Sequence, residues 1–120
     1  MNEKKDNKTK VPIDLESALE RTGNDEDFLY ELINIYVDDY EEKQQELKTA
    51  IQQENYSQIQ EIGHSLKGSS ANLSLTYMQA ASLDMEMAGR EKDIQKAQES
   101  LKKLESEFEL MKEHFADKLG

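Results

Sequence analysis

Cysteine and tryptophan are absent from this chain of 120 residues, and its single proline is Pro12. Without cysteine the chain has no disulfide, no thiolate metal site and no cysteine nucleophile. One proline and five glycines are too few for a sandwich or barrel rich in tight turns. The commonest residues are instead good helix formers such as Glu, Lys, Gln, Leu and Ala. This composition and length predict one all-α domain.

Long apolar runs and a positive charge balance are also missing. No run approaches the roughly 20 apolar residues that span a bilayer. The basic first ten residues have no apolar segment behind them, so we do not expect a secretory signal. The net charge of −11 disfavours nucleic acid as a partner. We therefore predict a disordered tail over residues 1–10 and a single helical domain over residues 11–120, located in the cytoplasm with no membrane contact.

Apolar residues recur mostly at steps of three and four, which predicts helices. A short first helix is expected after the cap Asp14 and ends at Gly23. Four longer helices follow, with Asn24 or Asp25, Asn55, Ser74 and Asp93 as caps and Gly89 as a stop, over about 25–53, 55–74, 75–88 and 93–115. Their short connections predict an up-down-up-down antiparallel four-helix bundle, with the short helix across one end.

The last predicted helix carries a strict heptad seam. Its apolar residues follow steps of 3 and 4: Ile94, Ala97, Leu101, Leu104, Phe108, Met111 and Phe115. Such a seam fits a dimeric coiled coil or one helix of an intramolecular bundle. Because the chain already offers bundle partners, the seam favours the bundle and a monomer.

The segment from Glu61 to Ser74, EIGHSLKGSSANLS, holds His64, one of two histidines. On a helical wheel His64 lies opposite a core stripe formed by Ile59, Ile62, Leu66, Ser69 and Leu73. The face of His64 is shared by residues at offsets of −4, +3, +4 and +7, which are Gln60, Lys67, Gly68 and Ala71. The imidazole is therefore predicted to project into solvent beside an ammonium group.

Gly63 and Gly68 strengthen this prediction, because a glycine inside a helix costs about 0.5–1 kcal/mol relative to alanine. Their presence suggests that something approaches the backbone closely. A cation at Lys67 is expected to lower the pKa of His64, and a neutral imidazole is what a nucleophile requires. The other histidine, His114, is assigned no catalytic role.

The run His64-Ser65-Leu66-Lys67-Gly68 and the small residues after it resemble the H-x-x-K-G signature of histidine-containing phosphotransfer (HPt) domains. The resemblance continues through Leu83 to Arg90, and more weakly back to residues 28–40. It implies a four-helix bundle whose histidine takes a phosphoryl group from the phospho-aspartate of one receiver domain and passes it to the aspartate of another. Two positions depart from the pattern: many members have glycine at Ser74 and a small residue such as alanine at Gly63.

The resemblance also implies roles for single residues. His64 would be the phosphoacceptor, and Lys67 would contact the phosphoryl oxygens. A receiver would dock over Gln60, Gly68, Ala71 and, through its charge, Arg90. Tyr36 and Tyr40 are expected in the core, with a place on the docking surface as the alternative.

Nucleotide-binding and metal-binding motifs are not found in the sequence. It has no P-loop, no kinase-type glycine-rich loop and no clustered metal-binding loop. We therefore expect a phosphohistidine carrier without its own ATP site or cofactor, and a receiver partner that supplies Mg²⁺. The expected partners are receiver domains of a hybrid sensor histidine kinase and of a downstream regulator. The alternatives are a helical adaptor or coiled-coil dimer without phosphotransfer, and an HPt fold that binds a receiver without accepting phosphate.

Overall fold

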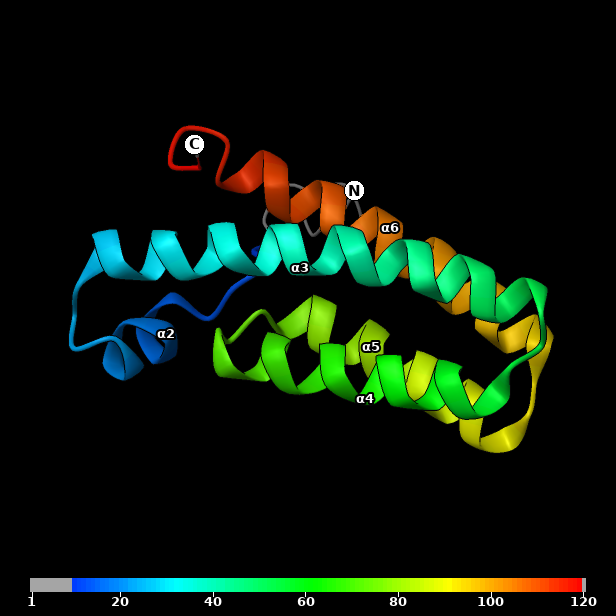
Figure 1. The fold of residues 1–120 in the computed structure, drawn as a ribbon. Coiled ribbons are helices and arrows are strands. Elements are labelled where there is room, and N and C mark those ends of the chain that lie inside the picture. Colours follow the sequence, from blue (N-terminus) through cyan, green and yellow to red (C-terminus); the bar gives the residue numbers. More distant parts are fainter. Residues whose placement is uncertain (1–9, 120) are drawn as a thin grey trace, which may run out of the picture.

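A computed structural model of the chain describes residues 10–119, and this part is all-helical with no strand. Figure 1 shows its helices, which are α2 (Leu15–Arg21), α3 (Glu26–Gln52), α4 (Tyr56–Asn72), α5 (Thr76–Glu91) and α6 (Ile94–His114). The all-α prediction is thus confirmed. None of these helices is both long and apolar enough to cross a membrane.

Side-chain caps begin four of the helices where the sequence predicts them. Asp14, Asp25, Asn55 and Asp93 each accept a hydrogen bond from the backbone N–H three residues later. Each cap satisfies one of the free N–H groups of a first helical turn. The starts of α2, α3, α4 and α6 are therefore specified locally by the sequence.

The two boundaries of α5 differ from the prediction. Gly89 does not end the helix, which continues to Glu91 and closes at Lys92 in a left-handed conformation with φ 56°. Ser74 does not cap α5 either, because its own φ is 57° and the cap position is Leu75, without a side-chain hydrogen bond. A left-handed residue favours glycine, which agrees with the glycine that many HPt domains have at this position.

The helices pack around one apolar core. The most extensive helix contact joins α4 to α5, and α6 packs mainly on α5. In Figure 1, α3 runs beside α6, while α4 and α5 lie below them. The short α2 is held at one end of this assembly, where the Asp14 N–H donates to the Ser74 carbonyl and Arg21 donates to the Ala71 carbonyl.

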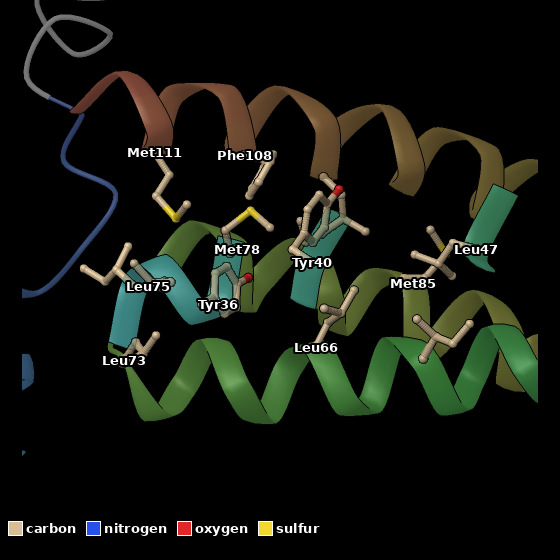
Figure 2. Close-up of a cluster of buried hydrophobic side chains, with 14 of the residues drawn as sticks. Tyr36, Tyr40, Leu47, Leu66, Leu73, Leu75, Met78, Met85, Phe108 and Met111 are labelled. Carbon is tan, nitrogen blue, oxygen red and sulfur yellow. The ribbon is translucent and has the colours of Figure 1, made fainter. Parts of the chain in front are cut away.

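Core residues from all four long helices meet in Figure 2, including Tyr40, Leu66, Met85 and Phe108. Tyr36 and Tyr40 are buried, so the core interpretation of both is correct and their place on a docking surface is excluded. The Tyr36 hydroxyl lies 2.7 Å from the Ser70 hydroxyl, which gives it a buried hydrogen-bond partner.

Several apolar positions lie elsewhere than the sequence pattern suggested. Phe28, Ile35 and Leu83 are apolar residues of the helices predicted over about 25–53 and 75–88, yet they are exposed, while Ile33 is completely buried. The physical reason is that a helix buries one stripe, and on α3 this stripe follows Leu29, Ile33, Tyr36 and Tyr40.

The heptad seam of α6 faces the rest of the molecule. Five of its residues are buried, namely Ala97, Leu104, Phe108, Met111 and Phe115.

The predicted tail falls mostly on residues 1–9, which lie outside the described part. Its last residue, Lys10, forms an ion pair with the buried Glu107 at 2.6 Å.

Candidate functional site

His64 lies on α4 with its ring in solvent, as the helical wheel predicts. Its side chain is 69% exposed. Gly68, one turn later, is also exposed, and a Cβ added to it would meet nothing within 4 Å. The surface beside the imidazole is therefore open to a partner.

A carboxylate that the sequence reasoning did not identify lies beneath this surface. Glu86 of α5 is only 4% exposed, and its Oε2 atom lies 3.0 Å from Nδ1 of His64. The Lys67 ammonium is 2.8 Å from Oε1, and the Arg90 guanidinium is 3.4 Å from Oε2. Glu86 thus connects three of the predicted site residues into one cluster, which we call the Glu86 cluster: His64, Lys67, Glu86 and Arg90.

Two glycines bring α4 and α5 close enough to form this cluster. A Cβ on Gly63 would lie 2.5 Å from the backbone nitrogen of Glu86, and a Cβ on Gly89 would collide with the backbone of Gln60. Real Cβ atoms are not found so close to a backbone. The sequence-based suggestion that something approaches Gly63 is therefore right, and the approaching segment is α5 rather than an external partner.

Charge within the Glu86 cluster keeps the buried carboxylate ionised. Its hydrogen bond with the Lys67 ammonium lowers the pKa of Glu86, burial acts in the opposite direction, and the hydrogen bond with His64 lowers the pKa further. The sequence suggested a lone cation beside the imidazole. In the structure the Lys67 ammonium instead contacts the Glu86 carboxylate.

The other predicted docking residues surround the same patch. Gln60 is half-buried and, together with Ser57, Glu61, His64, Glu86 and Arg90, lines a hollow of about 490 Å³. Ala71, two turns after His64, is half-buried, and its carbonyl accepts the hydrogen bond from Arg21. All six predicted residues therefore lie on or beside the α4–α5 face.

A second, more apolar hollow of about 570 Å³ lies where α2, α3 and α4 meet. Its lining includes the exposed Phe28 and Ile35 together with Leu32, Ser69 and Leu73. Both exposed residues come from the first half of α3.

Glu86 has one sequence signal that could have revealed it. It lies within the apolar face of α5, whose buried residues include Ser82, Met85 and Gly89. A charged residue on a buried helical face requires a partner of opposite charge.

Among the described residues, no group of three or more His, Asp or Glu side chains is arranged to hold a metal ion.

Comparison with known proteins gives one match. The family model described as Hpt domain matches residues 31–114, which is more than half of the chain and includes His64, Lys67, Glu86 and Arg90. Searches of curated proteins and of solved structures returned no match.

Proposed function

We propose that this chain, which belongs to the Hpt domain family, is a phosphorelay intermediate that carries the phosphoryl group on His64. Histidine phosphotransfer is what membership of the family implies. The observation that carries the assignment to His64 is its exposed ring on α4, with Lys67 and the open surface of Gly68 beside it. His114 is also exposed, at the end of α6, but its ring packs edge-on against Phe115, with the two ring centroids 4.8 Å apart.

Transfer begins when an imidazole nitrogen attacks the phosphorus of a receiver's phospho-aspartate. A nitrogen–phosphorus bond forms, the phosphorus–oxygen bond breaks, and the electron pair leaves on the aspartate oxygen. Lys67 lies on the same helical face, so its ammonium is available to the phosphoryl oxygens that arrive on His64. Transfer to a second receiver follows the same steps in reverse.

Docking of the receiver is proposed over the α4–α5 face. Gly68 leaves space for the partner's backbone, Gln60 and Ala71 flank the acceptor, and Arg90 adds positive charge. The neighbouring hollow with Phe28 and Ile35 extends this surface, because exposed apolar side chains beside a reactive residue favour a protein partner.

Mg²⁺ is expected to belong to the receiver and to neutralise charge on the transferring phosphoryl group. Glu86, the carboxylate beside His64, supports the assignment of Mg²⁺ to the receiver, because Lys67 and Arg90 already serve as its counter-ions. The chain is then a carrier rather than an enzyme with its own ATP site. Its two partners are proposed to be receivers of a hybrid sensor kinase and of a downstream regulator.

The arrangement proposed for the domain is an up-down-up-down antiparallel bundle with α2 across one end, in a monomer in the cytoplasm. Short connections between α3, α4, α5 and α6 support the antiparallel order. The burial of the α6 seam supports the monomer. The extent of the domain, residues 11–120, remains a prediction.

A helical adaptor or coiled-coil dimer without phosphotransfer is the alternative function. It assigns no role to His64, and it requires the α6 seam to be available to a second chain. The first test is to mix the chain with a phosphorylated receiver and Mg²⁺ and to follow acid-labile phosphate on the chain. We expect label on the unmodified protein and none on His64→Gln; label that persists on the variant, or fails to appear with every receiver tried, contradicts the proposal.

A further inference from the structure

We infer that Lys10 and Glu107 form a positioning pair, which holds α2 and the segment before it against the bundle and thereby shapes the surface on which a receiver docks. We call residues 10–22 the N-terminal strap. The seating of the strap is a property of the chain alone. Only its consequence for docking rests on the proposed function.

Glu107 is a buried carboxylate that depends on one counter-ion. It lies on α6, is 5% exposed, and its Oε2 atom is 2.6 Å from the Lys10 ammonium, the one cation of the described residues within 4 Å of it. Its Oε1 atom is buried and has no hydrogen-bond partner among the same residues. The ammonium also lies 4.3 Å from the centroid of the Tyr77 ring. Because an unpaired buried charge is costly, Glu107 favours the strap position that brings Lys10 to it.

The strap continues from this ion pair to the turn between α4 and α5. In Figure 2 it appears in blue and leaves the end of α6 near Met111. Pro12 and Ile13 are buried, and the Asp14 N–H donates to the Ser74 carbonyl at 2.9 Å. The segment before α2 is therefore attached at both of its ends, to α6 through charge and to the α4–α5 turn through a backbone hydrogen bond.

The short helix α2 has little packing of its own. It is seven residues long, and Ala18 is the one buried residue among them. Helices shorter than about 12–15 residues are marginal without tertiary support. The place of α2 at the end of the bundle therefore depends on the segment before it and on the hydrogen bond from Arg21 to the Ala71 carbonyl.

Part of the apolar hollow is formed by the strap. Arg21 and Thr22 line it together with Phe28 and Ile35 of α3. The Glu86 cluster lies instead on α4 and α5, and within the described part of the chain its hydrogen bonds and ion pairs involve no strap residue. Release of the strap therefore changes the docking hollow and leaves His64 and its neighbours in place.

Amide hydrogen exchange of Asp14 tests the seating of the strap, because this N–H is protected while it donates to Ser74. Lys10→Met keeps the apolar stem and removes the charge, so we expect the exchange rate of Asp14 to rise on the order of tenfold. The matched control is Lys96→Met. Lys96 is 35% exposed, against 28% for Lys10, and its ion pair with Glu91 at 3.2 Å lies outside the strap, so the control should leave the rate unchanged.

A double-variant cycle shows whether Lys10 acts through Glu107. Glu107→Met removes the other partner and should also accelerate the exchange of Asp14. Because the two residues act as one pair, the double variant should exchange no faster than the faster single variant. An unchanged rate in both single variants, or effects that multiply in the double variant, overturns the inference. If Lys10→Met does not fold, as judged by its amide spectrum, Glu107→Met decides alone: faster exchange supports the pair and an unchanged rate overturns it.

Phosphotransfer kinetics then test the consequence for docking. Only molecules with a seated strap present the complete hollow, so Lys10→Met should raise the KM for a phosphorylated receiver by about threefold or more and leave kcat within about twofold. Phosphoramidate is a small donor whose phosphorus–nitrogen bond breaks as ammonia leaves, and it needs no docking surface. It should phosphorylate His64 of this variant at the unmodified rate. An unchanged KM, or an equal loss of rate with both donors, contradicts the role in docking.

The strap and the proposed function fail on different results. Label that persists on His64→Gln contradicts the phosphoacceptor. Exchange of Asp14 that does not respond to the Lys10–Glu107 pair contradicts the strap, whichever residue carries the phosphoryl group.

Discussion

Glycines at the α4–α5 face serve two different purposes. Gly63 and Gly89 allow the two helices to approach until backbone contacts backbone. Gly68 has empty space around its Cα on the outer face. The same residue type is thus required by internal packing at two positions and, in the proposed function, by an external partner at the third.

Alanine substitutions should separate these purposes. Gly63→Ala places a Cβ 2.5 Å from the Glu86 nitrogen, so we expect the free energy of unfolding to fall by about 1–3 kcal/mol. Gly68→Ala meets nothing and gains helix propensity, so the same quantity should rise by about 0.5–1 kcal/mol. Urea unfolding followed by circular dichroism measures both, and equal effects at the two positions would contradict the packing described.

Glu86 should also leave a signature in the dependence of stability on pH. Its pKa is lower in the folded chain than its ordinary value of 4.5, so the folded state binds this proton less well than the unfolded state does. The stabilisation is then complete above pH 4.5 and is lost as the pH falls through the lowered pKa. Glu86→Met lacks this contribution to stability. As the pH falls, we therefore expect the free energy of unfolding to decrease more steeply in the unmodified chain than in Glu86→Met. Parallel curves would contradict the shift.

His64 and Lys67 could be predicted from the sequence because their relation is local. Three positions on one helix determine that both side chains lie on the same face. Glu86 is 22 residues from His64, and its contact depends on how α5 packs against α4. No periodicity within a single helix contains that information, although a buried charge among apolar residues indicates that a partner exists.

Helix starts are specified more sharply than helix ends in this chain. Four of the five described helices begin at an Asp or Asn that caps the first turn, and each cap is a short-range hydrogen bond. The end of α5 instead depends on packing, because Gly89 contacts the Gln60 backbone and the helix continues beyond it. The prediction of Gly89 as a stop was wrong because glycine serves close packing as well as termination.

The cap of α6 offers a test at this scale. Asp93 accepts the Lys96 N–H at 3.0 Å, and Asp93→Ala removes this bond. We expect the free energy of unfolding to fall by about 1 kcal/mol. Glu99→Ala, an exposed change on the same helix, should stay within about 0.5 kcal/mol of the unmodified chain. Thermal or urea unfolding of both variants measures these changes. A similar decrease in the free energy of unfolding of the two variants would contradict the capping role.

At the scale of the whole molecule, charge and apolar surface are distributed unevenly. Carboxylates are concentrated along α3, whereas α4 carries only Glu61 as an acid. The surface of α4 around His64, which is the phosphotransfer site in the proposed function, is therefore spared most of the net charge of −11. A receiver that brings its own carboxylates and phosphoryl group meets less repulsion there than elsewhere on the molecule.

The burial of the α6 seam supports the proposed monomer. Because Leu104, Phe108 and Met111 pack inside the molecule, they are not available to a second chain. Light scattering should give a molar mass near 13.9 kDa that does not change with concentration. A mass of twice that value would favour the coiled-coil alternative and would require α6 to leave its place against α5.

The most direct test of the central claim is to locate the phosphoryl group. After phosphotransfer from a receiver, digestion and mass spectrometry under alkaline conditions should place one added phosphoryl group on the peptide that contains His64 and none on the peptide that contains His114. A phosphoryl group on His114 or on any other side chain would contradict the account of the α4–α5 face as the phosphotransfer site.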